Sequence, residues 1–217
     1  RTPSVQTDIT TLAEGIEGAG MHLDFILFDD CYMSSVEVAY DLRHVTDYLI
    51  ACPTEIMAYG MPYADVGPEL LGEPDYEAVC SKFLDFYSSY TYPYGTIGVT
   101  RTSELDSLAR VLRKIETAYD LDASLLPDLQ RMDGYRPPIF YDLGDYVSAL
   151  CTDTALLSEF EGQLDRAVPY KANTPQYYSA FSGAEDIRAY SGITTSAPTT
   201  SSYAADWAAT SWYEATH

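Results

Sequence analysis

A chain of 217 residues with 47% hydrophobic and 21% charged residues has the composition of a globular protein that can bury a sizeable core. Its 33 acidic residues outnumber 12 basic ones, and the resulting net charge of −21 argues against nucleic-acid binding and is compatible with a cationic substrate. No apolar segment approaches the ~20 residues of a membrane-spanning helix. The four cysteines contain no Cys-x-x-Cys pair and histidines are scarce, so we expect no zinc site.

Helix and strand patterns alternate from the start of the chain. Apolar residues at helical spacing predict a helix over residues 9–16 behind a Thr7 cap, and an apolar run predicts a buried strand over residues 23–28. A Ser-x-x-Glu capping box at Ser34 predicts a helix directly afterwards, and residues 47–52 read as a second buried strand. Two strands joined by a short helix indicate a right-handed βαβ unit with parallel strands.

The alternation continues to about residue 120, which indicates the α/β class, and then gives way to mostly helical patterns. We therefore divide the chain into a core of residues 1–120 and a mostly helical C-terminal subdomain of residues 121–217 packed on it. The later predicted elements are helices over residues 75–87 and 104–119 around a strand over residues 95–100, then helical pieces over residues 121–131 and 146–164 and a strand over residues 189–194.

The first predicted strand ends in Asp29, Asp30 and Cys31, and a helix begins soon after them. Ligands of open α/β sheets bind beyond the carboxyl ends of strands, and the dipole at a helix N-terminus favours thiolate over thiol. Cys31 is therefore our candidate nucleophile. A buried structural thiol is an alternative, although uncompensated carboxylates beside it would be costly to bury. A metal-dependent hydrolase using both carboxylates is another, but the chain lacks a phosphate-binding loop.

A cysteine nucleophile normally needs a histidine base, and the three histidines of this chain are poorly placed for that role. His22 begins the strand that Cys31 follows, roughly 25–30 Å away at ~3.3 Å per residue. His44 ends the next helix, about 15 Å away. His217 is the last residue, where chains fray. We therefore expect the base to come from a segment outside this chain.

Two motifs lie close together around these residues. Asp-x-Cys-x-Met-x-x-Val-Glu-Val-Ala-Tyr begins at Asp29, and Pro-Thr-Glu-Ile-Met-Ala-Tyr-Gly-Met-Pro-Tyr spans residues 53–63. Together they resemble the clostripain family of cysteine peptidases, of the caspase-like clan. The resemblance implies a caspase-like α/β/α sandwich with a largely parallel central sheet, completed by an upstream segment. Residues 1–120 would then be the C-terminal half of the catalytic core.

The resemblance also implies roles for three residues. Cys31 matches the nucleophile, and its amide would contribute to the oxyanion hole, while the partner His lies in the upstream segment. Asp29 matches the carboxylate that lines the S1 pocket, which holds the residue before the scissile bond (P1) and here would select Arg or Lys. Tyr59 stands where many relatives carry a second S1 aspartate, which leaves the choice between Arg and Lys open.

Relatives are commonly cut after a basic residue between the His and the Cys, which leaves two associated chains. Because the sequence begins with Arg1 rather than Met, we interpret it as the cysteine-bearing product of such self-cleavage, partnered by the N-terminal chain of the same precursor. The resemblance further implies a bacterial, exported enzyme that needs no cofactor for its chemistry, with Ca²⁺ as a stabilising ion of some relatives. The alternative function is a catalytically degenerate member that binds a peptide or partner.

Overall fold

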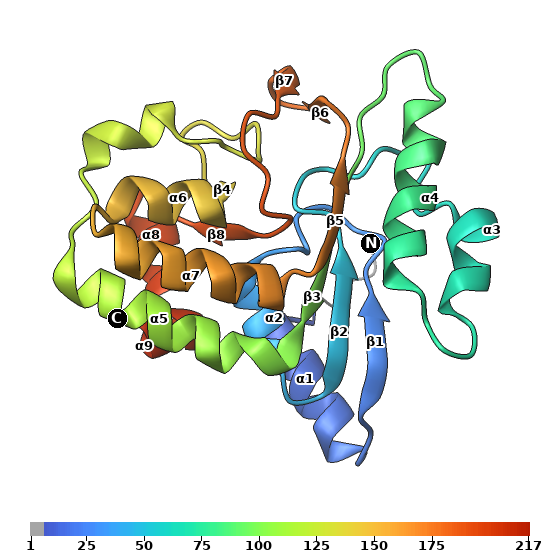
Figure 1. The fold of residues 1–217 in the computed structure, drawn as a ribbon, viewed down its shortest axis with the longest axis horizontal. Coiled ribbons are helices and arrows are strands. Elements are labelled where there is room, and N and C mark those ends of the chain that lie inside the picture. Colours follow the sequence, from blue (N-terminus) through green and yellow to red (C-terminus); the bar gives the residue numbers. More distant parts are fainter. Residues whose placement is uncertain (1–6) are drawn as a thin grey trace, which may run out of the picture.

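A computed structural model describes residues 7–217 and places helices on both faces of a four-stranded sheet (Figure 1). This α/β/α arrangement confirms the predicted fold class, although the sheet of the described residues is mixed rather than largely parallel. The strand order is β1-β2-β3-β5, in which β1 and β2 are parallel, as the βαβ pattern predicts, and the other two pairs are antiparallel. The strands of this sheet are β1 (Leu23–Leu27), β2 (Thr46–Ala51), β3 (Thr96–Arg101) and β5 (Tyr170–Asn173).

The two faces of the sheet have separate hydrophobic cores. Alternate side chains of β2 point to opposite faces, so that Leu49 and Ala51 join the larger core and Ile50 joins the smaller one. Helices of the larger core are α1 (Ile9–Gly18), α2 (Val36–Leu42), α5 (Leu105–Ala118), α6 (Leu143–Leu150), α7 (Thr154–Ala167) and α9 (Ser211–Thr216). The smaller core lies under α3 (Tyr63–Val66) and α4 (Tyr76–Ser88) (Figure 1).

Four short strands lie outside the central sheet. β4 (Phe140–Asp142) pairs with β8 (Thr194–Ser196), and a bridge from Ser35 to Thr194 places β8 beside the start of α2. β6 (Gln176–Ser179) and β7 (Gly183–Asp186) form a hairpin directly after β5. The helix α8 (Ser201–Ala208) follows β8. Short 3₁₀ segments complete the described elements: Gly67–Leu70, Thr102–Glu104 and Ala123–Asp128.

Several sequence-based details differ from the structure. α1 is capped by Asp8 rather than Thr7, and α2 by Ser35 rather than Ser34. The hydroxyl of Ser34 instead donates to Gly192 O at 2.8 Å. The helix predicted over residues 146–164 is two helices, because the Asp153 side chain caps α7 and starts a new helix there.

The C-terminal part of the chain contributes to the central sheet as well as to its helical cover. β5 lies beyond residue 120, yet it pairs with β3. The division of the chain at residue 120 stays a prediction. Within residues 7–217, no helix combines the length and the apolar character that crossing a bilayer would require.

The carboxyl group of Glu116 on α5 is held between α6 and α9. Tyr146 Oη donates a hydrogen bond to Glu116 at 3.5 Å, and His217 Nε2 lies 3.7 Å from its other oxygen. Burial, reinforced by the charge of Asp120, raises the pKa of Glu116 to about 7, although the Tyr146 bond acts in the opposite direction. Because this pKa exceeds the ordinary 4.5, the folded state retains a proton that the unfolded chain has released. The contribution of Glu116 therefore lowers the free energy of unfolding as the pH rises from 4.5 to 7.

We predict that Glu116→Gln increases the free energy of unfolding at pH 8 by about 1–3 kcal/mol, because the neutral amide removes the cost of burying a charge. The difference between variant and wild type should shrink towards pH 4.5. Urea unfolding at pH 5 and pH 8 measures both values. Glu17→Gln on the exposed face of α1 serves as the control and should change neither. A Glu116→Gln protein less stable than the wild type at pH 8 would contradict the assignment.

Candidate active site

The loop after β1 carries Cys31 and is fixed by backbone hydrogen bonds to the end of β2 and to the chain that follows it. Phe28 N donates to Ile50 O at 3.0 Å, and Tyr32 N donates to Thr54 O at 3.1 Å. Tyr32 has φ 62°, a left-handed conformation that is uncommon for a residue other than glycine. A strained residue persists where its surroundings determine the conformation. Cys31 is therefore presented by a loop of defined shape at the carboxyl end of β1.

The thiol of Cys31 is half-buried, and its Sγ lies 3.9 Å from Ile56 O. Burial raises the pKa of this thiol above its ordinary 9.0; the charges of Glu55 and Asp30 add to the effect, and the Ile56 contact opposes it. The sequence-based expectation of a thiolate favoured by the following helix is therefore wrong for the described residues. α2 begins only at Val36, and the Ser35 side chain already caps it.

All four cysteines are free, and the other three differ from Cys31 in being buried. Burial raises the pKa of the Cys80 thiol to about 12 and that of Cys52 well above its usual value. Cys31 is consequently the thiol that an added reagent can reach first.

Asp29 lies two residues before Cys31 and has an exposed side chain. Its Oδ1 accepts a hydrogen bond from Met61 N at 2.8 Å, and its Oδ2 accepts one from Tyr63 Oη at 3.1 Å. Gly60 packs so closely that a Cβ there would lie 2.9 Å from Oδ2, and its φ of +67° also favours glycine. No cationic side chain of residues 7–217 pairs with Asp29. The carboxylate is thus oriented by its neighbours while its charge stays uncompensated.

The structure places Tyr59 next to this loop, but its ring stacks on Tyr90 with centroids 4.3 Å apart, and 57% of the residue is exposed. Asp30 is exposed and makes no side-chain hydrogen bond within residues 7–217. No group of three or more metal-ligating side chains gathers anywhere in that described range.

The three histidines do not contact Cys31. His22 pairs with Asp47 at 2.9 Å and contacts His44 O at 3.2 Å, at the end of β1 opposite the site. The sequence suggested that His217 would be frayed, but its ring stacks on Tyr213 with centroids 3.9 Å apart. Within the described residues, no imidazole is hydrogen-bonded to the thiol.

Glu55 joins the Cys31 loop to the β6–β7 hairpin, a connection that the sequence did not indicate. Tyr32 Oη donates to Glu55 Oε1 at 2.8 Å, and Ser179 Oγ donates to the same oxygen. Ala180 N lies 3.1 Å from both carboxylate oxygens. Ser179 and Ala180 lie more than a hundred residues further along the chain, where no local pattern could show the connection.

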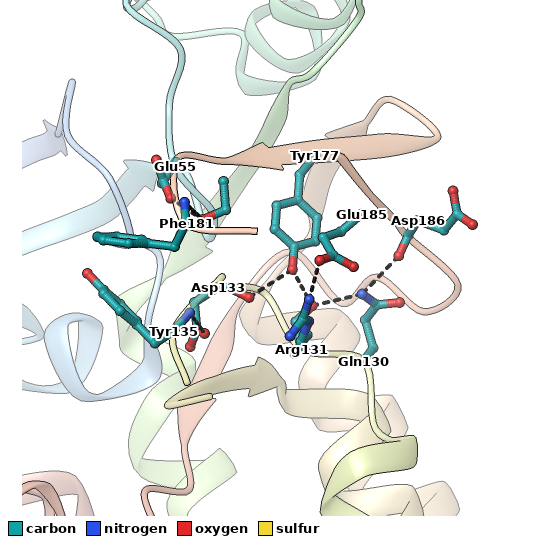
Figure 2. Close-up of polar contacts among 10 residues, drawn as sticks. Glu55, Gln130, Arg131, Asp133, Tyr135, Tyr177, Phe181, Glu185 and Asp186 are labelled. Carbon is teal, nitrogen blue, oxygen red and sulfur yellow. Dashed lines mark hydrogen bonds and ion pairs between the residues drawn. The ribbon is translucent and has the colours of Figure 1, made fainter. Parts of the chain in front are cut away.

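The segment before β4 is fixed to the same hairpin (Figure 2). Tyr177 Oη lies 3.2 Å from Arg131 O and 3.1 Å from Asp133 O, and Arg131 forms an ion pair with Glu185. The buried Asp133 carboxylate accepts three backbone hydrogen bonds from residues 135–140. These contacts hold the segment as a wall next to the Cys31 loop.

Aromatic rings fill the space between this wall and the Cys31 loop. Tyr135 packs against Phe181 in a tilted arrangement with centroids 5.0 Å apart, and Figure 2 shows the two rings next to each other below Glu55. Tyr32 packs against Tyr135 and Phe140, with centroids 5.8 and 5.2 Å apart. Aromatic packing and the Glu55 bonds therefore hold the residue after Cys31 in place together.

We predict that Glu55→Ala lowers the free energy of unfolding by about 1–3 kcal/mol, because it leaves the Tyr32 and Ser179 hydroxyls and the Ala180 amide without their acceptor. Urea unfolding measures the loss, and a double-mutant cycle with Tyr32→Phe measures the coupling. Glu73→Ala, at an exposed position, is the matched control. Strict additivity of Glu55→Ala and Tyr32→Phe would show that the bond contributes nothing.

Alkylation of Cys31 in this chain alone should accelerate about tenfold per pH unit from pH 7 to 9, because the thiolate reacts and its pKa is raised. Iodoacetamide labelling followed by peptide mass spectrometry reports the rate for each cysteine. The buried Cys80 and Cys151 serve as internal controls and should react more slowly. A Cys31 rate that stays constant between pH 6 and 8 would indicate a thiolate already formed and would contradict the prediction.

Comparison with known proteins assigns the chain to a family. Residues 6–151 match the model of the clostripain family. A clostripain from Bacteroides thetaiotaomicron ATCC 29148, solved in complex with the peptide inhibitor BTN-VLTK-AOMK, is 54% identical and superposes with a TM-score of 0.96, over 100% of this chain and 97% of that one. No curated protein matches the sequence.

Two longer solved chains are also similar. A secreted cysteine protease of Bacteroides thetaiotaomicron, called iotapain, is 55% identical over 98% of this chain and 60% of its own, with a TM-score of 0.95. An inactive zymogen protease of Parabacteroides distasonis is 34% identical over 97% of this chain and 62% of its own, with a TM-score of 0.85. The chain therefore spans about three fifths of these two relatives. It belongs to the clostripain family of cysteine proteases.

Proposed function

We propose that this chain is the nucleophile-bearing part of a cysteine endopeptidase that cleaves peptide bonds after Arg or Lys. One observation carries the proposal: a partly exposed thiol, Cys31, lies two residues from the exposed and uncompensated carboxylate of Asp29 at the carboxyl end of β1. A nucleophile and a charge selector on one short loop suit cleavage next to a cationic side chain.

A Lys or Arg side chain at P1 would pair with Asp29, whose two oxygens are already oriented by Met61 and Tyr63. Neutral side chains would leave that carboxylate without a partner. The peptide of the inhibitor bound to the Bacteroides thetaiotaomicron relative, VLTK, ends in lysine, which supports the same preference. Tyr59, stacked on Tyr90 beside Gly60, would add a ring face to the pocket in place of a second charge.

The reaction would follow the Cys–His route to an acyl-enzyme. The imidazole takes the proton of Cys31, and the sulfur forms a bond to the scissile carbonyl carbon. The amide of Cys31 stabilises the oxyanion. The imidazolium then protonates the leaving amine as the C–N bond breaks, and water hydrolyses the thioester. In this scheme the raised pKa of the isolated thiol falls when a positive imidazolium lies beside it.

The edge of the sheet offers a place for the segment that carries the histidine. β1 pairs only with β2 among the described residues, and its apolar side chains Phe25, Ile26 and Leu27 are only half-buried. A further strand added parallel to β1 would cover them and would end beside Cys31, because parallel strands end at the same edge of a sheet. We assign this strand to the N-terminal chain of the same precursor, separated by self-cleavage.

Maturation, export and cofactor use are part of the same proposal. The relative described as an inactive zymogen supports a maturation step, and the secreted relative iotapain supports export. Covalent catalysis by a thiol needs no metal, and calcium would serve stability only.

The test uses the precursor together with its matured form. Cys31→Ala should abolish both self-cleavage and hydrolysis of peptide reporters with Lys or Arg at P1. Asp29→Asn should keep alkylation of Cys31 while lowering kcat/KM for these reporters by about 10²-fold, because an ion pair within the pocket is lost. Its neighbour Asp30→Asn is the matched control and should change kcat/KM by about fivefold at most.

Each part of the proposal can fail separately in this experiment. Normal hydrolysis by Cys31→Ala would contradict the assignment of Cys31 as the nucleophile. An unchanged preference for basic P1 residues in Asp29→Asn would contradict the role of Asp29 in the S1 pocket. A wild-type protein that binds Lys-containing peptides without hydrolysing them would instead establish the degenerate, peptide-binding alternative.

A further inference from the structure

A cavity of about 410 Å³ opens next to Cys31 and includes that residue in its wall. It lies on the α2 side of the sheet, between the first turns of α2, the β4–β8 pair and α8. The Asp29 carboxylate instead contacts Met61 and Tyr63, in the chain that leads into the core under α4. The thiol therefore stands between an acidic site and a second cavity that the proposed function does not use.

The surface of this cavity is almost entirely apolar. Met33, Val38, Ile139 and Pro198 contribute apolar side chains to its lining, together with Tyr203, which is 52% exposed. A charged side chain would lose its hydration here, whereas an aliphatic or aromatic one would be removed from water. The volume lies within the ~300–1,000 Å³ that is typical of binding pockets.

Two residues of the lining also have buried polar atoms without a hydrogen-bond partner in residues 7–217, namely Oε2 of Glu37 and Nε1 of Trp207. Glu37 is 9% exposed, and its other oxygen accepts a hydrogen bond from Ser196 N at 2.8 Å. Both atoms are fully buried and so do not face the open cavity, whose reachable surface stays apolar.

We propose that this cavity is the subsite for P1′, the residue directly after the scissile bond, and that it takes a large aliphatic or aromatic side chain. The inference rests on the proposed function. With P1 held at Asp29 and its carbonyl at the Cys31 sulfur, the leaving part of the peptide continues from that sulfur. Of the two sites beside the sulfur, the apolar cavity is the one left for it.

The experiment measures kcat/KM of the matured protease for peptides that share Lys at P1 and differ only at P1′. Leu and Phe should exceed Gly, Asp and Lys by about tenfold, the ratio expected for burying part of a large apolar side chain. A lysine methyl ester reporter provides the baseline, because its methanol leaving group cannot fill the cavity.

Variants of the wall should change the P1′ preference without changing the baseline. Met33→Ala and Tyr203→Ala should reduce the ratio of Leu to Gly about threefold each, because part of the apolar surface is lost. Val38→Phe should fill the cavity and favour Gly over Leu. Ser202→Ala, exposed on α8 and outside the cavity, is the matched control and should keep the wild-type ratio.

The outcomes separate this inference from the function on which it rests. If the lysine methyl ester is not hydrolysed by a protein whose Cys31 is intact, the proposed function itself fails. If the ester is hydrolysed while the Leu to Gly ratio is close to one, or is the same in Met33→Ala and Val38→Phe, the P1′ assignment is overturned. A preference for Asp or Lys at P1′ would overturn it equally.

Discussion

The parallel pairing of β1 with β2, continued beyond the end of β1, is the constraint on which the candidate site depends. Past the strand, Phe28, Tyr32 and Ser34 each donate a backbone hydrogen bond to residues 50–54. These bonds fix the left-handed turn at Tyr32 and leave the thiol of Cys31 at the surface. Glu55 and the aromatic wall then hold Tyr32 from the other side. A side chain whose backbone is fixed in this way loses little conformational freedom when a ligand binds beside it.

The two cores of the sandwich give Cys31 two different neighbours. On the α4 side, the chain around Gly60 orients the Asp29 carboxylate, and on the α2 side an apolar cavity opens beside Met33. An uncompensated charge on one side and an apolar surface on the other suit a peptide that is basic before the scissile bond and apolar after it. The net charge of −21 would attract such basic segments over a longer range.

The sequence indicated the elements near the site well and the remote ones poorly. The apolar run of β1 and the βαβ spacing are local signals, so the strand, its parallel neighbour and the position of Cys31 were predictable. The β4–β8 and β6–β7 pairs are only three or four residues long. Strands of that length are too short to show the alternation of apolar and polar residues that identifies a strand in a sequence. The Glu55 network and the cavity wall combine side chains that are far apart in sequence, so only the folded chain brings them together.

The most direct test of this account is hydrogen–deuterium exchange across β1, measured on this chain alone and on the matured protein that retains its N-terminal part. If a strand carrying the histidine pairs with β1, amides of residues 23–28 should exchange at least about tenfold more slowly in the matured protein, because those on the open edge gain hydrogen-bond partners. Equal exchange in the two samples would mean that the edge stays unpaired. The account of a site completed by another segment would then be wrong.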